Sequence, residues 1–279
     1  MIRNRNIIRG FFRHGFISLF SIIILIPVLF TVMTSFKFSR DIISGSFVFT
    51  PTFKNYTELF VASRSNFTRL TINSLITGFG TTVIVIIIGS LAAYSLSRFR
   101  WRTIISTVVM GWLLFVHMLP PIIFVGPYYI ITRQIGIYDT PLAVMMGYIV
   151  LWLPLAIWIL HDFFSDVPKE LEESAYVDGA TRIQAFWKII IPIARPGIAA
   201  AAVIVFVFCF KEFLFALVLT STPNGMTIPV GIASFVQEWN IRYGEMSAAA
   251  FFASIPGMFM VIFMQRYIIK GMTLGALKG

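Results

Sequence analysis

The 279-residue sequence has few charged side chains, few acidic ones and almost no cysteine. Charged residues make up 12% of the chain and hydrophobic residues 58%, whereas an ordinary soluble domain has about 25% charged and about 45–50% apolar residues. So few charges cannot cover the surface of a soluble protein of this size. The composition therefore excludes a soluble globular protein, a disordered chain and a collagen-like scaffold, and it indicates a polytopic membrane protein.

The single cysteine, Cys209, excludes an internal disulfide and any zinc or iron–sulfur site built from several cysteines. His14, His117 and His161 lie far apart and form no His-Glu-x-x-His pair, so the sequence offers no metal site, and we expect His117 to be a packed, hydrogen-bonded side chain. The sequence contains no Gly-x-x-x-x-Gly-Lys-Ser/Thr phosphate-binding loop. We therefore expect no catalytic residue, no bound cofactor and no ATP hydrolysis by this chain alone.

Six segments are apolar enough, and near enough to the about 20 residues that a membrane-crossing helix needs, to be predicted as spans. The predicted fold is an all-α polytopic membrane protein with one transmembrane domain over residues 1–279. The predicted spans cover residues 15–36, 72–96, 103–125, 141–160, 197–219 and 246–265. The first span follows four arginines and could also be a signal peptide, but its length and the absence of a clear cleavage site favour a retained signal anchor.

The distribution of basic residues predicts the orientation of these spans. With the N-terminus inside, 14 of the 22 Lys and Arg residues fall in inner segments and seven in outer loops. This excess indicates that the N-terminal arm 1–14 and the tail 266–279 are both cytoplasmic. The net charge of +10 therefore reports topology, and we expect no nucleic-acid partner.

The loop of residues 161–196, between the fourth and fifth spans, is predicted to form two short cytoplasmic helices with a turn between them. Ser165 or Asp166 can cap the first helix, with Pro168 in its first turn. A left-handed glycine is expected to end this helix, and a Thr-x-x-Gln capping box is expected to start the second. The residues concerned are Glu170, Glu172 and Glu173 near the first N-terminus, Gly179, Thr181, Gln184, and Pro192 and Pro196 at the return to the membrane. Such a loop is either a surface element without a partner or a docking site for another protein.

Within this loop the chain carries a spaced motif. Glu173-Ser174-Ala175, Gly179, and Ile189 to Pro192 match Glu-Ala-Ala, three residues, Gly, nine residues, Ile-x-Leu-Pro, with Ser174 and Ile191 as conservative departures. In this motif the sequence resembles the membrane subunits of bacterial ABC importers. The segment 168–180 resembles the carbohydrate-uptake class, in particular the maltose-type second permease subunit.

The resemblance implies a multi-pass permease of the bacterial inner membrane that forms half of the pathway for a sugar, oligosaccharide or polyol. Its implied partners are a second permease subunit, an extracytoplasmic solute-binding protein, the lipid bilayer, and two ATPase subunits that bind ATP and Mg²⁺. The two short helices would dock into a cleft on the ATPase. The residues implied in this coupling are Glu170, Glu172, Glu173, Ala175, Asp178, Gly179 and Pro192.

Lys211 and Glu212 are charged residues inside the predicted fifth span. The resembled class commonly has Trp-Asn-Glu-Phe where this chain has Phe-Lys-Glu-Phe, so Lys211 departs from the pattern. A lysine within a span must face protein, a cavity or the membrane surface. It either reaches the outer surface, pairs with an acid of another helix, or lines the translocation path together with Glu212. The last alternative favours an anionic substrate such as a sugar acid or glycerol phosphate.

The outer loop of residues 220–245 is predicted to contact the binding protein through Asn224, Gly225, Trp239, Arg242 and Tyr243, since Trp, Tyr and Arg are favoured at interfaces. Anchoring of the aromatic residues at the membrane surface is the alternative. A different class, an ion-coupled secondary transporter, predicts paired broken helices or a set of carboxylates within the spans that couple to ions. Glu212 is the only Asp or Glu inside the six predicted spans.

Overall fold

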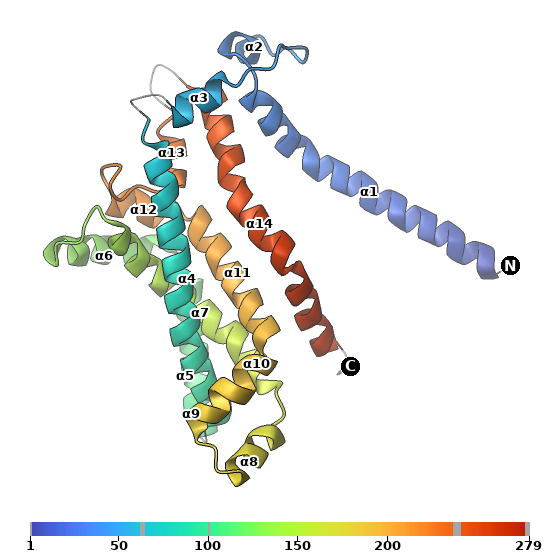
Figure 1. The fold of residues 1–279 in the computed structure, drawn as a ribbon, viewed down its shortest axis with the longest axis vertical. Coiled ribbons are helices and arrows are strands. Elements are labelled where there is room, and N and C mark those ends of the chain that lie inside the picture. The colour runs from blue at the N-terminus through green and yellow to red at the C-terminus, as the bar shows by residue number, and fades with distance from the viewer. Residues whose placement is uncertain (1, 62–64, 100, 237–240, 277–279) are drawn as a thin grey trace. The chain divides into compact units, whose positions relative to one another are not determined.

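The computed structural model describes residues 2–61, 65–99, 101–236 and 241–276 (Figure 1). The chain divides into two compact units. The first comprises Met1–Asn66 with Ile232–Ser254, and the second Phe67–Gly231 with Ile255–Gly279. Across the described ranges the backbone is almost entirely helical, and its one extended pairing is an isolated bridge between Val236 and Ile241.

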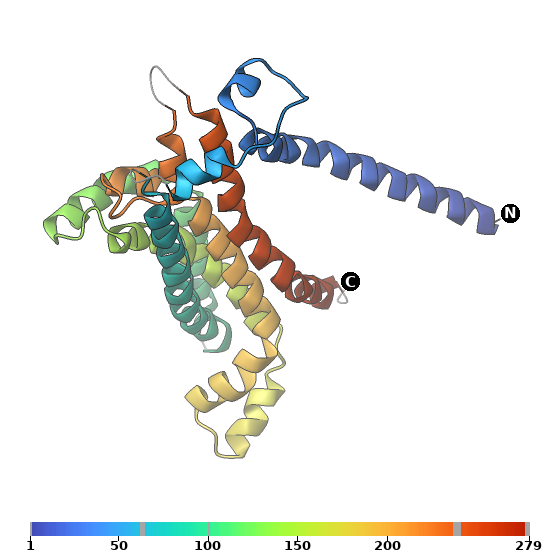
Figure 2. The same cartoon turned by 45° about the horizontal axis from the view of Figure 1, so that its top comes forward.

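Three long helices make the centre of the second unit: α4 (Phe67–Arg98), α7 (Pro141–Ser165) and α11 (Arg195–Lys211). Glycines on α4 let its neighbours approach closely, since a Cβ on Gly78 would lie 3.1 Å from Phe206 and one on Gly89 would lie 3.4 Å from Leu160. Fully buried side chains from all three helices form the core, and they include Val85, Tyr148, Leu160 and Phe206. The helices run side by side in both ribbon views (Figures 1 and 2).

Four of the six predicted spans correspond to single long apolar helices. They are His14–Ser35 within α1 (Ile2–Ser35), α4, α7, and Tyr243–Phe263 within α14 (Tyr243–Ala276). The fourth span was predicted to end at residue 160, but α7 continues to Ser165. Residues 161–165 contain neither proline nor glycine, so nothing local ends the helix at residue 160.

The prediction of one continuous helix over residues 103–125 is wrong. The third span is a bent pair, α5 (Thr103–Met118) and α6 (Ile122–Gln134), with an angle of 89° between them. The bend falls at Leu119-Pro120-Pro121, where Leu119 has extended dihedral angles (φ −67°, ψ 136°). A residue that precedes proline disfavours the helical region, so the double proline ends α5.

The prediction of one helix over residues 197–219 is also wrong. Here α11 ends at Lys211, Glu212 is extended, and a separate helix, α12 (Leu214–Leu219), follows. The carboxylate of Glu212 accepts hydrogen bonds from the backbone N–H groups of Phe215 (3.1 Å) and Ala216 (3.4 Å). This side chain therefore caps α12 and satisfies backbone donors that the break leaves without helical partners. A short helix, α13 (Ile228–Ala233), follows α12.

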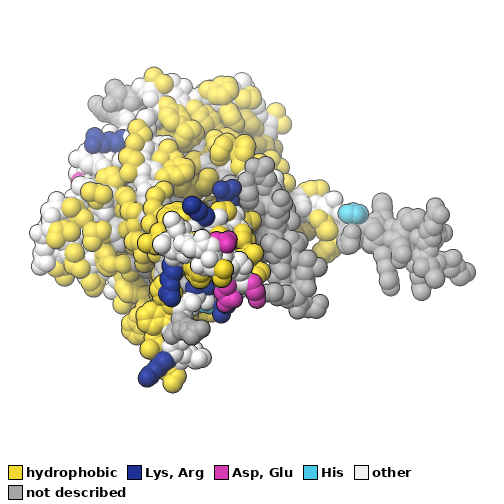
Figure 3. Space-filling model, turned by 60° about the horizontal axis from the view of Figure 1, so that its bottom comes forward, with side chains coloured by type: hydrophobic (Ala, Val, Ile, Leu, Met, Phe, Trp, Pro, Cys, Tyr) yellow, Lys and Arg dark blue, Asp and Glu magenta, His cyan; other side chains and the backbone are white. Residues whose placement is uncertain are grey.

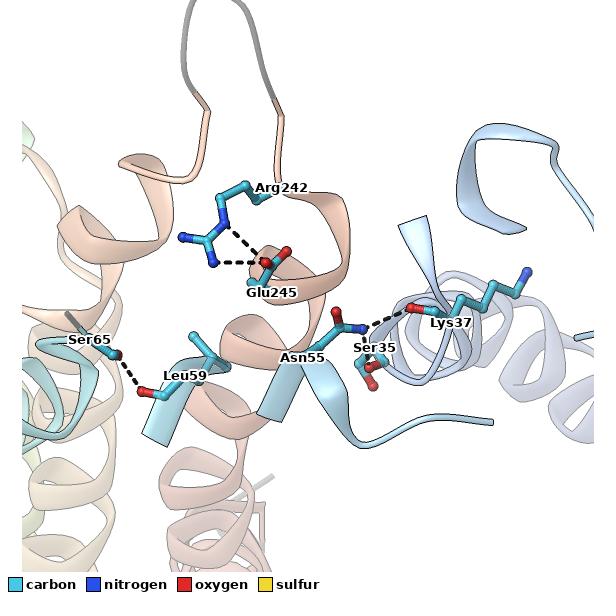
Figure 4. A network of polar contacts seen from close by, with 7 residues as sticks. All are labelled: Ser35, Lys37, Asn55, Leu59, Ser65, Arg242 and Glu245. Atoms are coloured by element: carbon cyan, nitrogen blue, oxygen red, sulfur yellow. Dashed lines mark hydrogen bonds and ion pairs between the residues drawn. The ribbon is translucent and has the colours of Figure 1, made fainter. Parts of the chain in front are cut away.

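In the first unit, α2 (Ser39–Ile43) and α3 (Lys54–Phe60) follow α1 in the chain. The buried amide of Asn55 donates to the carbonyl oxygens of Ser35 (2.8 Å) and Lys37 (2.9 Å), which ties α3 to the end of α1 (Figure 4). Gly244 allows α14 to approach, because a Cβ there would lie 2.5 Å from the Asn55 side chain. Ser65 donates to the carbonyl oxygen of Leu59 in the same figure.

A buried lysine closes the loop that follows α1. Lys37 is 4% exposed, and its ammonium group donates to the carbonyl oxygen of Ser46 at 2.7 Å. It also lies over the rings of Phe30 and Phe47, each at 5.8 Å, and of Phe49 at 4.8 Å. These contacts replace part of the hydration that burial removes from the charge.

Candidate functional site: the loop between α7 and α11

The loop between α7 and α11 contains α8 (Glu170–Val177), α9 (Arg182–Ala185), a π-helical turn η1 (Phe186–Ile190) and α10 (Ile191–Ile193). The predicted helix–turn–helix is confirmed. Gly179 has φ +86°, in the left-handed region expected after the first helix. The capping box is complete: Gln184 N–H donates to the Thr181 hydroxyl (3.3 Å), and Thr181 N–H donates to the Gln184 side chain (2.8 Å).

The predicted start of the first helix is wrong. Ser165 ends α7 and Asp166 directly follows it, so neither caps α8. Lys169 takes the cap position of α8 without a side-chain bond, and Pro168 lies before the helix. The longer α7 accounts for this difference, because it uses the residues that could have formed the cap.

The second helix is not a regular α-helix. Pro192 has no N–H group, and in an α-helix its ring would meet the carbonyl group of Lys188. Lys188 lies in the π-helical turn, whose wider winding accommodates such a residue. Within this turn, the side chains of Phe186 and Ile190 are buried and pack in one cluster with Tyr94 and Phe164. The apolar residues of this segment are therefore partly covered by the chain's own helices.

The predicted coupling residues differ in exposure, and Glu172 alone is buried. Glu170, Glu173, Asp178 and Gly179 are exposed, whereas Ala175 and Pro192 are half-buried. Figure 3 shows acidic and basic side chains gathered on the end of the molecule that carries α8, amid hydrophobic ones. A hollow of about 120 Å³ lies among them, with Lys169, Glu173, Tyr176 and Arg182 in its lining. This surface offers charges of both signs to a partner.

Glu172 differs from the other glutamates because its side chain is buried and paired within the chain. Its carboxylate lies 2.6 Å from Nε of Arg98, the last residue of α4, and both side chains are 5% exposed. In the sequence, Arg98 is one of the 14 basic residues of the predicted inner segments, and no other role was predicted for it. A tyrosine and an arginine four positions apart at the end of a span, Tyr94 and Arg98, are the signal in the sequence that could have indicated a polar site there.

Lys211 lies exposed at the break between α11 and α12. Its ammonium group lies 4.4 Å from the centre of the Phe208 ring, and that ring stacks on Trp152 with centroids 4.6 Å apart and an angle of 8°. His117 contacts Trp152 edge to face at 6.1 Å. Among the residues that the structure describes, Lys211 has no carboxylate within 4.0 Å. The side chain of the adjacent Glu212 instead accepts hydrogen bonds from the backbone of α12.

At the opposite end of α4 from Arg98, the backbone after α12 is held firmly. Asn73 donates its amide to the carbonyl oxygens of Pro223 (3.0 Å), Asn224 (3.0 Å) and Met226 (2.9 Å). Asn224 is exposed, but Gly225 is buried, and a Cβ on it would lie 2.7 Å from the backbone of Asp139. The structure thus gives Gly225 a packing role.

Asp139 holds the same turn. It has φ +62°, and its carboxylate accepts bonds from the N–H groups of Ser221 (2.8 Å) and Thr222 (2.9 Å) and from the Thr222 hydroxyl (2.5 Å). Partial burial alone would raise the pKa of Asp139, but these three bonds outweigh it and hold the pKa below its ordinary value.

The remaining predicted contacts for a binding protein lie in the first unit. Arg242 pairs with Glu245, with Nε at 3.0 Å and Nη2 at 2.8 Å from the same oxygen (Figure 4), and its guanidinium group lies over Phe235. Tyr243 is exposed at the start of α14. Trp239 lies outside the described residues.

Comparison with known proteins places this architecture in a family. Residues 85–274 match the family described as binding-protein-dependent transport system inner membrane component. The chain therefore belongs to this family of transporter permeases, and the resemblance seen in the sequence is confirmed. It is a membrane subunit of a transport complex.

Two relatives and one solved structure are particularly similar. The trehalose transport system permease protein SugB of Mycobacterium tuberculosis is 38% identical over 258 residues, 91% of this chain and 93% of the relative. The trehalose/maltose transport system permease protein MalG of Thermococcus litoralis is 36% identical over 265 residues, 94% of each chain. A crystal structure of a bacterial ABC transporter involved in the import of the acidic polysaccharide alginate shares the fold, with a TM-score of 0.77, 19% identity and coverage of 93% of this chain and 96% of that chain.

Proposed function

We propose that this permease imports a sugar, oligosaccharide or polyol as one of two permease subunits of an ABC importer. The support is the likeness to permeases named for trehalose and maltose, which extends over more than nine-tenths of the chain. The complete importer would also contain two ATPase subunits and an extracytoplasmic solute-binding protein. The apolar part of α1 supports a further contact with lipid or with the second permease, because residues 14–30 are all exposed.

The loop between α7 and α11 is the proposed docking element for the ATPase. The observation that carries this proposal is the exposed acidic surface of α8, which ends in the left-handed turn at Gly179. Glu173 is exposed and free to meet a basic residue, in a contact of about 1.5–3 kcal/mol per charge-assisted hydrogen bond. ATP and Mg²⁺ would bind to the ATPase, which supplies the chemical energy.

This assignment sets the orientation of the chain. The loop would be cytoplasmic, as would both termini, in agreement with the excess of basic residues in the same segments. The turn held by Asp139 and Asn73 would then face outward. Its exposed Asn224, together with the exposed Tyr243 and the paired Arg242, remains our proposal for contacts with the binding protein.

The test is the substitution Gly179→Asp, with Gly136→Asp as its matched control. Both glycines have positive φ, +86° and +74°, and a Cβ on either meets no atom within 4 Å. Both variants therefore carry the same backbone strain of about 1–2 kcal/mol, but only Gly179 lies on the proposed docking surface. We expect Gly179→Asp to lose co-purified ATPase by about tenfold or more, and Gly136→Asp to retain it.

Equal amounts of ATPase with both variants would refute the docking proposal. Reconstitution in vesicles then separates the importer from an ion-coupled carrier. The chain alone should transport no trehalose, whereas uptake should appear with the ATPase, the second permease, the binding protein and ATP. Uptake by the chain alone, driven by an ion gradient, would favour the secondary transporter.

A second candidate substrate class, an anionic sugar or glycerol phosphate, is favoured by Lys211. This cation is exposed at a break between two helices of a span and has aromatic rings beside it, but no carboxylate within 4.0 Å among the described residues. Discontinuous helices often form substrate sites in transporters. Lys211 would meet the anionic group, while Phe208 and Trp152 would contact the apolar faces of the ring.

Uptake by Lys211→Asn tests this assignment, with Lys54→Asn, an exposed lysine of the first unit, as the control. Each is measured in the complete transporter with trehalose and with glucuronate as substrates. We expect Lys211→Asn to lower glucuronate uptake by about tenfold or more and to spare trehalose. Unchanged uptake of both compounds would remove Lys211 from the path.

A further inference from the structure

The inner end of α4 carries a buried charge pair that joins it to α8. Nε of Arg98 lies 2.6 Å from Oε1 of Glu172, and each side chain is 5% exposed. The same guanidinium group donates from Nη2 to the carbonyl oxygen of Val167 at 2.6 Å. Arg98 therefore holds both the helix α8 and the segment that leads into it.

Two tyrosines complete the environment of the carboxylate. Tyr94, one turn before Arg98 on α4, donates its hydroxyl to Oε2 of Glu172 at 2.9 Å. Tyr176, one turn after Glu172 on α8, donates to the same oxygen at 3.2 Å. The Tyr94 bond crosses from one helix to the other, whereas the Tyr176 bond stays within α8. A buried carboxylate with these partners resists separation from them, because separation leaves charges without compensation.

The covalent connections of α8 to the membrane helices are less direct. Between α7 and α8, residues 166–169 belong to neither helix. On the other side, residues 182–193 meet α11 at an angle of 77°, after the π-helical turn. Neither connection is a straight helix, so neither transmits a displacement of α8 rigidly.

In contrast, α4 is well placed to receive such a displacement. It is a single helix of 32 residues, without proline, from Phe67 to Arg98. It packs on α7 and α11 along its length, at Gly89 against Ala156 and Leu160 and at Gly78 against Phe206. A movement of its inner end must therefore affect the packing of the central helices.

We propose that the cluster of Arg98, Glu172 and Tyr94 is the contact that makes α4 move together with α8 when the ATPase displaces α8. Arg98 and Tyr94 are positioning residues in this scheme, since they act through α8. The proposal rests on the docking proposed above. It assigns the inner end of α4 as the route by which ATP-driven movement enters the membrane.

Distances between spin labels test the proposal without knowledge of the substrate. Cysteines replace Leu171 on α8 and Ile87 on α4, both exposed; the one native cysteine, Cys209, is buried. The labelled chain is measured in the complete complex, first without nucleotide and then with Mg²⁺ and a non-hydrolysable ATP analogue. The wild-type cluster should give the same single distance in both states.

Two mild variants should loosen the cluster. Tyr94→Phe removes the bond between the helices, and Arg98→Lys keeps the charge but not the paired geometry. In each variant we expect the nucleotide to produce a second distance between the two labels, from complexes in which α8 has separated from α4. The fraction of such complexes should be about tenfold higher than in the wild type. Tyr176→Phe, which removes only the bond within α8, should resemble the wild type. If Arg98→Lys fails to assemble, Tyr94→Phe decides alone.

A distance that changes with nucleotide in the unsubstituted cluster would overturn the proposal. So would Tyr94→Phe behaving as Tyr176→Phe does. Both outcomes differ from a failure of the docking proposal, in which no ATPase co-purifies with the wild-type chain or Gly179→Asp retains it fully. Retained docking in Tyr94→Phe with separate movement of α8 and α4 would support the cluster's role.

Discussion

The packing of α12 against α7 can be tested at Gly147. A Cβ on this glycine would lie 2.1 Å from Cδ1 and 2.7 Å from Cε1 of Phe215, whose side chain is fully buried. Real Cβ contacts are never this short, so Gly147→Ala must displace the ring or move the helices apart. Overpacking of this kind destabilises by about 1–3 kcal/mol, and the severity of the overlap indicates the upper end of that range.

The matched control is Gly111→Ala. Gly111 lies inside α5, and a Cβ on it meets no atom within 4 Å. Alanine in a helix is favoured over glycine by about 0.5–1 kcal/mol, and both variants share this gain. We therefore expect Gly147→Ala to lower the free energy of unfolding by about 2 kcal/mol, and Gly111→Ala to raise it slightly.

The assay is unfolding of the purified chain in detergent micelles, followed by tryptophan fluorescence. Phe215→Leu combined with Gly147→Ala supplies the second check, because a smaller side chain relieves the overlap. The double variant should be more stable than the sum of the two single effects predicts. Additive effects, or a Gly147→Ala chain as stable as Gly111→Ala, would refute the steric reasoning.

Two further predictions concern the other polar anchors. The lowered pKa of Asp139 means that its charged form contributes stability above the ordinary pKa of the group, about 4, and that this contribution is lost as the pH falls through the lower folded-state pKa. The melting temperatures of wild type and Asp139→Asn should therefore differ at pH 7, and the difference should shrink as the pH is lowered below about 4. A constant difference would contradict this. Lys37→Met should lower stability by about 1–3 kcal/mol through loss of the Ser46 bond and the cation–ring contacts, whereas the exposed Lys54→Met should change it by less than about 0.5 kcal/mol in the same melting assay. Equal effects of the two lysine substitutions would show that the burial of Lys37 adds nothing.

The parts of this fold that were predictable depend on local chemistry. Gly179 and the Thr181–Gln184 capping box were recognisable because their bonds close within four residues of the chain. The apolar helices were recognisable by length and composition. The position of the break after Lys211 was not, because no proline or glycine marks it, and the bonds that Glu212 accepts there from Phe215 and Ala216 are seen only in the structure.

The polar contacts between distant segments also escaped prediction. Tyr94 and Glu172 are 78 residues apart, and Asn73 and Pro223 are 150 residues apart. Nothing in either local sequence specifies the partner. Glu172 in particular is one of three glutamates within four residues, and nothing in the sequence distinguishes it from the other two. Only tertiary packing shows that Glu172 is buried while Glu170 and Glu173 are exposed.

The two anchored ends of α4 make this helix a lever. Asn73 near its first turn holds the turn of residues 223–226, and Arg98 at its last residue holds α8. At 1.5 Å per residue, its 32 residues extend for about 48 Å. A tilt of about 10° around the midpoint of such a rod moves each end by about 4 Å, in opposite directions. Asn73 lies about 14 Å from the midpoint, so the same tilt would move the far turn by about 2.5 Å in the opposite direction. A single tilt of α4 would therefore shift both anchored segments at the same time.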